Sequence, residues 1–171
     1  ALIHEGRPDA TFLVPLVTRA TREHFDEVRH RLGFDGLPIT LLYGHAGDAL
    51  KAADVGVVAS GTATLEAALA RCPHVIYYRV SRLTAWIVAR KLRVPWVGLP
   101  NILAGRFVVP EFLQDDATAD NLAQALGNLY VDRQVREKLQ QVFTEIHTTL
   151  RQGTSARAAA AILPYLGRVA A

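Results

Sequence analysis

The segment 54–70 constrains the fold more than any other part of the sequence. Residues 55–58 (VGVV) form a short apolar run of mostly β-branched side chains, which is typical of a strand buried on both faces of a parallel sheet. Residues 60–62 (Ser-Gly-Thr) follow as a turn, and residues 63–70 (ATLEAALA) are strong helix formers. A strand, a tight turn and a helix in this order predict a βαβ unit in an α/β fold.

The same turn predicts an anion-binding site. Free N–H groups in the first turn of a helix point toward the carboxyl end of the strand before it, which is where phosphates bind in α/β sheets. We therefore expect Ser60, Gly61, Thr62 and Ala63 to bind a phosphate, and Glu66, one helical turn further on, to reach a sugar hydroxyl attached to it. The alternative is that Ser60 only caps the helix and that Glu66 is a solvated acid favoured by the helix dipole.

Strands and helices are predicted to alternate through residues 1–117. Apolar runs predict strands at 11–15, 39–43, 55–58, 74–78 and 96–99. The segments between them predict helices at 21–32, with Thr21 as the cap, and at 46–53, 63–70 and 81–92. This order favours a Rossmann-like, doubly wound parallel sheet. The chain opens on the tail of a helix, so we expect the first strand of the sheet to be missing and the chain to be a fragment of a longer protein.

Residues 118–171 are predicted to form a helical tail. Apolar residues recur at three- and four-residue intervals over 120–130, 132–151 and 155–166, and no strand is expected among them. Their long apolar face exceeds what a sheet already flanked by helices needs. The tail is therefore expected to pack against another domain or chain, and exchange of its helices between protomers would give a homodimer.

The composition excludes several classes of protein. No apolar run reaches the length of a membrane-spanning helix, and charged residues near the N-terminus argue against a secretory signal. The 6 histidines show no metal-ligand spacing and the chain has 1 cysteine, so we expect no disulfide, metal site or cofactor. These features are typical of a protein in the reducing cytoplasm, and no nucleic-acid partner is expected.

A long stretch of the chain carries only basic charges. Between Glu66 and Glu111 there is no acidic residue, while the cations are Arg71, Arg79, Arg82, Arg90, Lys91, Arg93 and Arg106. This predicts a surface that meets anions. Within it, residues 81–92 combine Trp86 and Ile87 with cations, which is the composition of a helix lying on an anionic membrane surface. The alternative is a helix whose apolar side chains cover the sheet while its cations are solvated.

Several segments in a fixed order resemble a known family. They are 59–66 (ASGTATLE), 70–73 (ARCP), 78–79 (YR), 99–106 (LPNILAGR) and 110–114 (PEFLQ). Together they resemble the C-terminal half of the lipid-A-disaccharide synthases, from about residue 11 to the end of the chain. The segment 99–106 is the most diagnostic of them.

This resemblance implies the nucleotide-sugar domain of a GT-B glycosyltransferase. Such enzymes transfer 2,3-diacylglucosamine from UDP-2,3-diacylglucosamine to 2,3-diacylglucosamine 1-phosphate in the lipid A biosynthesis of Gram-negative bacteria, and they release UDP. The transfer is inverting and metal-independent, and the family's enzymes act at the cytoplasmic face of the inner membrane. The general base would come from an N-terminal domain that has no counterpart here. The chain is therefore expected to be the donor-binding part, peripheral to the membrane and inactive alone.

The resemblance also implies roles for individual residues. Ser60 to Ala63 and Glu66 would bind the phosphates and the ribose of UDP. Asn101, expected in a loop after the strand 96–99, would be catalytic beside the transferring sugar and would affect turnover more than folding. Arg79, Glu111 and Gln114 would contact substrate at the cleft. The alternatives are a turn-shaping role for Asn101, a surface charge at Arg79 and an ordinary helix start at Glu111 and Gln114.

Other functions remain open from the residues alone. The first is a non-catalytic nucleotide-binding or assembly module. The second is another GT-B enzyme, such as a UDP-GlcNAc epimerase or a peptidoglycan-precursor transferase, because these share a strand-turn-helix donor site with a glutamate in the following helix. The segment 99–106 favours the lipid A enzymes over both.

Overall fold

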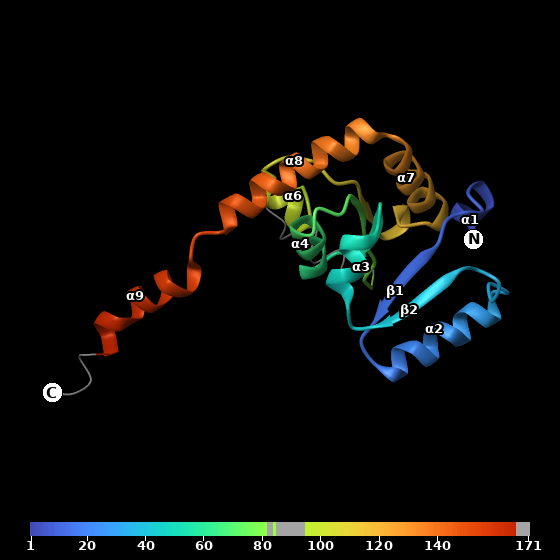
Figure 1. The fold of residues 1–171 in the computed structure, drawn as a ribbon, viewed down its shortest axis with the longest axis horizontal. Helices are drawn as coiled ribbons and strands as arrows, with labels where there is room; N and C mark the ends of the chain where they lie inside the picture. Colours follow the sequence, from blue (N-terminus) through green and yellow to red (C-terminus); the bar gives the residue numbers. More distant parts are fainter. Residues whose placement is uncertain (82–83, 85–94, 167–171) are drawn as a thin grey trace.

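The computed structural model describes residues 1–81, 84 and 95–166. Helices and strands alternate along much of this part of the chain and all paired strands are parallel, which confirms the predicted α/β class (Figure 1). The strands are β1 (Phe12–Leu16), β2 (Ile39–Tyr43), β3 (Gly56–Ala59), β4 (His74–Tyr78) and β5 (Glu111–Leu113). The helices are α1 (Leu2–Gly6), α2 (Arg19–Arg31), α3 (Ala46–Ala52), α4 (Thr62–Leu69), α6 (Leu99–Ala104), α7 (Ala119–Val131), α8 (Arg133–Leu150) and α9 (Thr154–Leu166), with a 3₁₀ turn at Gln114–Asp116.

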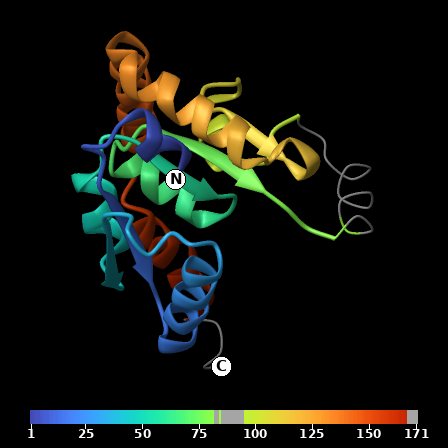
Figure 2. The ribbon, with the colours of Figure 1, turned by 90° about the vertical axis from the view of Figure 1, so that its right-hand side faces the viewer.

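The described strands form two sheets instead of the one doubly wound sheet predicted. β1 pairs with β2 in a two-stranded sheet, and the other sheet has the order β3-β4-β5. In the view of Figure 2, α7 and α8 lie above the strands and α2 lies at the bottom. The predicted helix 81–92 lies outside the described residues, apart from Ser81 and Thr84.

A cavity of about 690 Å³ lies between the two sheets. Its walls include residues 12–15 of β1 and 56–59 of β3, together with Leu126 and Tyr130 of α7. Each of the two strands has one partner among the described strands, so the backbone groups of its other edge are left without a ladder. The order β2-β1-cavity-β3-β4-β5 matches the Rossmann order 3-2-1-4-5-6 with the place of strand 1 open. The missing first strand stays a prediction, and the cavity is where it would lie.

A strand added in this cavity should stabilise the fold. We expect a chain extended at its N-terminus by one β-strand that fills this cavity to melt at a higher temperature than the 171-residue chain. The reason is that each new backbone hydrogen bond contributes about 0.5–1.5 kcal/mol. Thermal unfolding followed by circular dichroism measures the difference. An extension of equal length with prolines at alternate positions lacks every second backbone N–H, so it cannot pair fully with both neighbouring strands and is the control. Equal melting temperatures of the two extended chains would contradict the prediction.

Helices α7 and α8 complete the hydrophobic core over the β3-β4-β5 sheet. Leu139, Phe143 and Ile146 of α8 are buried in one cluster with Val75 and Ile76 of β4. Leu139, Phe143 and Ile146 therefore face this chain's own sheet, whereas Val131 and Val135 are exposed, and the expected packing of the tail on another domain or chain stays a prediction. The bounds of both helices agree closely with the periodicity in the sequence.

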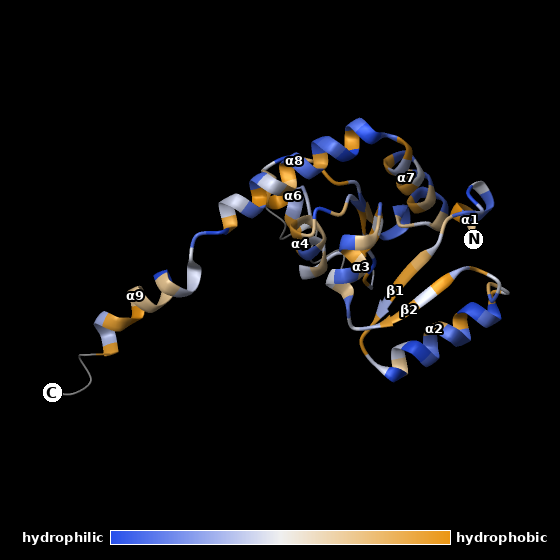
Figure 3. Ribbon diagram, viewed as in Figure 1, coloured by the Kyte–Doolittle hydropathy of each residue, from blue (hydrophilic) through white to orange (hydrophobic). Residues whose placement is uncertain are grey.

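Helix α9 is different, because it has no buried residue. It leads away from the rest of the molecule, and apolar residues gather along it (Figures 1 and 3). Leu163 and Tyr165 are 63% and 69% exposed. The expected packing of the tail on another domain or chain stays a prediction for this helix as well.

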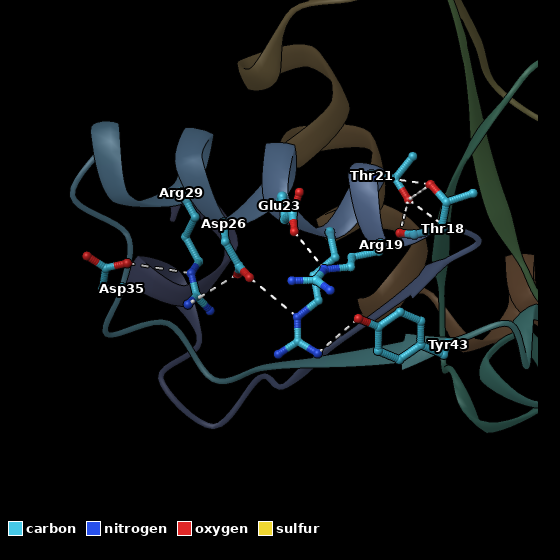
Figure 4. Close-up of polar contacts among 9 residues, drawn as sticks. Thr18, Arg19, Thr21, Glu23, Asp26, Arg29, Asp35 and Tyr43 are labelled. Atoms are coloured by element: carbon cyan, nitrogen blue, oxygen red, sulfur yellow. Dashed lines mark hydrogen bonds and ion pairs between the residues drawn. The ribbon is translucent and has the colours of Figure 1, made fainter.

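Helix α2 begins earlier than predicted. Thr18, and not Thr21, is its N-cap. The Thr18 hydroxyl accepts from the Thr21 N–H at 3.1 Å, and the Thr21 hydroxyl accepts from the Thr18 N–H at 3.1 Å, which makes a reciprocal cap (Figure 4). On the exposed face Arg19 pairs with Glu23 at 2.8 Å. Exposed pairs of this kind stabilise a helix by less than about 1 kcal/mol, so the cap and the packing on the strands matter more.

His74 is a buried titratable group at the start of β4. Its Nδ1–H donates to the Cys72 carbonyl at 2.8 Å, which leaves Nε2 as the unprotonated nitrogen of the neutral ring. Nε2 is buried without a hydrogen-bond partner in the described part of the chain, and the ring stacks on Phe143 of α8. Burial lowers the pKa of His74 to about 4, because a proton on Nε2 would place an unpartnered charge in the core.

We expect the stability of the fold to fall as the pH drops from 6.5 to about 4. In the unfolded chain His74 binds a proton at its ordinary pKa, whereas in the folded chain it stays neutral down to about pH 4. The free energy of unfolding is therefore unaffected by His74 above pH 6.5 and decreases toward pH 4, by up to about 3 kcal/mol. His74→Asn keeps a donor for Cys72 and cannot ionise, so it should reduce this pH dependence in urea unfolding. His24→Asn, at an exposed position, is the control. Identical pH dependence in His74→Asn and the parent would contradict the prediction.

Candidate functional site

The end of β3 and the start of α4 build the turn at residues 60–63. The Ser60 N–H donates to the Tyr77 carbonyl at 2.8 Å and so continues the pairing of β3 with β4. Gly61 then turns the chain at a φ of 145°, a conformation that residues with a Cβ rarely adopt. Helix α4 follows at once, so the N–H groups of its first turn lie at the carboxyl end of β3. This is the strand-turn-helix arrangement that the sequence predicts, and it suits an anion.

Thr64 and Glu66 extend the turn along α4. Thr64 is fully buried and its hydroxyl donates to the Gly61 carbonyl at 2.7 Å, which holds the turn against the helix. Glu66 is exposed one helical turn later, and with Ala63 it lines the cavity between the sheets. A carboxylate in this place can accept hydrogen bonds from the hydroxyl groups of a ligand whose phosphate lies on the turn.

Glu111 and Gln114 bind backbone groups of this chain. Glu111 accepts from the Val97 N–H through Oε2 and from the Gly98 N–H through Oε1, both at 2.9 Å. The Gln114 amide donates to the Val80 carbonyl at 3.2 Å and accepts from the Val80 N–H at 2.9 Å. The two side chains therefore hold the chain where it leaves β4 and where it returns before α6.

Asn101 lies in helix α6 with its side chain fully buried. Its Nδ2 donates to the Val109 carbonyl at 2.8 Å and to Glu111 Oε1 at 2.7 Å. Its Oδ1 accepts from the N–H groups of Val108 and Val109, both at 2.8 Å. A primary amide has two donor hydrogens and two lone pairs, so the side chain has no hydrogen-bonding position left for a ligand.

The predicted strand at 96–99 and the loop after it are wrong. Gly98 is the N-cap of helix α6, and Pro100 lies in the first turn of that helix. Proline fits there because its fixed φ is helical and its missing N–H has no partner in a first turn. Asn101 is therefore held inside a helix and not in a loop. A Gly-x-Pro sequence at the end of an apolar run is the signal that could have shown this helix start.

The predicted site residues fall into groups. Ser60, Asn101 and Glu111 form one hydrogen-bonded group. The Val97 carbonyl accepts a hydrogen bond from the Ser60 hydroxyl at 3.3 Å, and the Val97 N–H donates to the Glu111 carboxylate. Ala63 and Glu66 form a second group on the cavity wall. Arg79 is exposed directly after β4, as expected from the sequence.

The whole of this site lies within a family match. The profile of a family described as lipid-A-disaccharide synthetase matches residues 1–164. The chain belongs to the lipid-A-disaccharide synthase family. The match begins at the first residue, whereas the motifs place the start of the resemblance near residue 11.

Curated relatives agree with the family match. The chain is 53% identical to a lipid-A-disaccharide synthase of Dechloromonas aromatica over 93% of its length and 42% of that protein's. It is 52% identical to a synthase of Chromobacterium violaceum over 91% of its length and 40% of that protein's. For a synthase of Pectobacterium atrosepticum the identity is 41% over 95% of this chain and 42% of that protein. The chain thus spans about 42% of the length of several of these synthases.

The described helices include none that is long and apolar enough to cross a membrane. The predicted membrane-surface segment, with Arg82, Trp86, Ile87, Arg90 and Lys91, falls outside the described residues.

Replacing Asn101 should destabilise this family member. Asn101→Ala leaves the half-buried N–H of Val108 and the buried N–H of Val109 without an acceptor, and an unsatisfied buried group costs about 1–3 kcal/mol. Urea unfolding of the variant and the parent measures the loss. Asn128→Ala, on the exposed side of α7, should change the stability little. Unchanged stability of Asn101→Ala would instead favour the expectation from the sequence that Asn101 acts on turnover.

Proposed function

We propose that the chain is the donor-binding part of a lipid-A-disaccharide synthase. In the full-length enzyme, 2,3-diacylglucosamine is transferred from UDP-2,3-diacylglucosamine to 2,3-diacylglucosamine 1-phosphate, and UDP is released. The observation that carries the proposal is the turn at residues 60–63, which opens a helix at the carboxyl end of a parallel strand in a chain of this family. In Rossmann-like sheets this is where nucleotide phosphates bind.

The turn can stabilise the leaving group without a metal. Negative charge develops on UDP as the bond to the sugar breaks. Backbone N–H groups of residues 61–63 and the dipole of α4 meet this charge, while the Ser60 N–H already donates to the Tyr77 carbonyl. Arg79, exposed after β4, can add a cation at the same edge of the sheet. Transfer to the opposite face of the sugar then inverts the anomeric centre, with a general base supplied from outside this chain.

Glu66 is proposed to bind the ribose of UDP. It is exposed on α4, one helical turn from the proposed position of the phosphates. A carboxylate accepts from both hydroxyl groups of a diol, and these charge-assisted bonds are stronger than neutral ones. Residues Glu111 and Gln114, which bind backbone groups in this chain, are proposed to support the cleft without contacting the substrate.

The acyl chains of both substrates place the full-length enzyme at a membrane surface. We propose that the protein acts in the cytoplasm at the inner membrane, and that the remaining domain of the full-length enzyme carries the acceptor site. The exposed apolar residues of α9, Ile162, Leu163, Tyr165 and Leu166, are proposed to pack on that domain or on a second protomer.

UDP binding to the full-length protein tests the proposal. Glu66→Ala should weaken the affinity for UDP by about 1.5–3 kcal/mol, or roughly 10- to 150-fold, because hydrogen bonds to a charged group are lost. Calorimetry should give the same affinity for inorganic pyrophosphate in the variant and the parent, because pyrophosphate has no ribose. Glu145→Gln, on the exposed side of α8, is the control. Absence of UDP binding by the parent would contradict the function, and an unchanged UDP affinity in Glu66→Ala would contradict the role of Glu66.

A further inference from the structure

The carboxylate of Glu111 is surrounded by hydrogen-bond donors. Oε2 accepts from the Val97 N–H, and Oε1 accepts from the Gly98 N–H and from Asn101 Nδ2 at 2.7 Å. These donors belong to the chain entering α6 and to its first turn, where a negative charge also meets the positive end of the helix dipole. Hydrogen bonds to a carboxylate are among the strong ones in proteins. Glu111 therefore holds the entry to α6 in one position.

One peptide unit connects Glu111 to the 60–63 turn. The N–H of Gly98 and the C=O of Val97 belong to the same planar peptide group and point in opposite directions. The N–H donates to Glu111 at 2.9 Å, and the C=O accepts from the Ser60 hydroxyl at 3.3 Å. Hydrogen bonds in such a chain polarise one another, so the negative charge on Glu111 strengthens the acceptor that Ser60 uses.

The peptide unit has little room to move. A Cβ on Gly98 would overlap the side chain of Ile76 and would lie 2.8 Å from Glu111 Oε1. Ile76 is itself fully buried in β4. Behind Glu111, the buried Asn101 amide binds the backbone of Val109, so the carboxylate is held from that side as well. The position of Glu111 is thus transmitted to Ser60 through a rigid link.

We propose that Glu111 is a positioning residue that sets the place of Ser60 in the phosphate-binding turn through the Val97–Gly98 peptide. The inference rests on the proposed function only for the identity of the ligand, UDP. Glu111 touches neither the phosphates nor the sugar in this account. It acts by fixing the Ser60 end of the turn before the nucleotide arrives, so that less ordering is needed on binding.

The test variant is Glu111→Gln in the full-length protein. Its amide keeps the shape of the side chain. All three groups that bind the Glu111 carboxylate are hydrogen-bond donors, so in either orientation of the amide its NH₂ group faces an N–H group and at least one of these hydrogen bonds is lost. Hydrogen–deuterium exchange without ligand measures how firmly the turn is held. The reporting amides are those of Ser60 and Thr64, which donate to the carbonyls of Tyr77 and Gly61. We expect their exchange to accelerate about tenfold and UDP affinity to fall about tenfold, as for one charge-assisted hydrogen bond.

Internal and matched controls separate positioning from general destabilisation. Exchange of the β4 amides at residues 75–77 should stay at the parent rate, because these belong to the core. Asp115→Asn makes the same chemical change at an exposed position on the neighbouring 3₁₀ turn and should leave both measurements unchanged. If Glu111→Gln does not fold, Glu111→Asp is used in its place, because it keeps the charge and withdraws the carboxylate by one methylene.

A combination with Ser60→Ala tests the link itself. Ser60→Ala breaks the same link at its other end, so adding Glu111→Gln to it should not accelerate exchange of the turn further. Additive effects of the two changes would overturn the proposal. So would parent-like exchange of the Ser60 and Thr64 amides in a folded Glu111→Gln protein. Failure of the parent to bind UDP would contradict the proposed function instead, and the exchange rates would still decide the role of Glu111.

Discussion

The parallel pairing of β3, β4 and β5 is the constraint on which the rest of the described structure depends. Parallel strands end at one edge of their sheet, so the residues that follow them, Ser60, Arg79 and Gln114, come to that edge although they are far apart in the sequence. A parallel connection needs a crossover, and α4 provides it between β3 and β4. The strand-turn-helix geometry of the 60–63 turn is therefore a consequence of the way the sheet is connected.

Satisfaction of buried polar groups decides how the rest of that edge is built. Apart from α6, most described residues between β4 and β5 lie outside helices and strands, so their backbone groups need partners that a sheet ladder does not supply. Asn101 and Glu111 supply them to residues 97, 98, 108 and 109. Asn101 and Glu111, which the sequence suggests as ligand contacts, thus bind the backbone that supports the 60–63 turn. A fully satisfied polar network of this kind favours one rigid arrangement.

Local patterns predicted those parts of the fold that local interactions control. The β-branched run before Ser60 and the alanine-rich segment after it became β3 and α4, and the periodic apolar residues of the tail became α7, α8 and α9. The same reasoning failed at residues 96–99, where an apolar run is compatible with a strand by pattern alone. There the N–H groups of residues 97 and 98 donate to Glu111, more than ten residues away, and these bonds hold the two residues at the start of a helix. Pairing of Thr18 with Thr21 likewise allowed either residue to be the cap, and the turn geometry selected Thr18.

The sequence by itself determined the α/β class, the strand-turn-helix of the 60–63 turn and the family, because these depend on residue type and spacing along a short stretch of chain. Only the tertiary structure decided which polar side chains remain available to a ligand. Glu66 stays exposed on α4, whereas Asn101 is buried with every hydrogen-bonding position filled. Tertiary packing also decided that α8 covers this chain's own core through Phe143 while α9 does not. The physical reason is that burial and hydrogen-bond satisfaction depend on partners distant in the sequence, which no local pattern specifies.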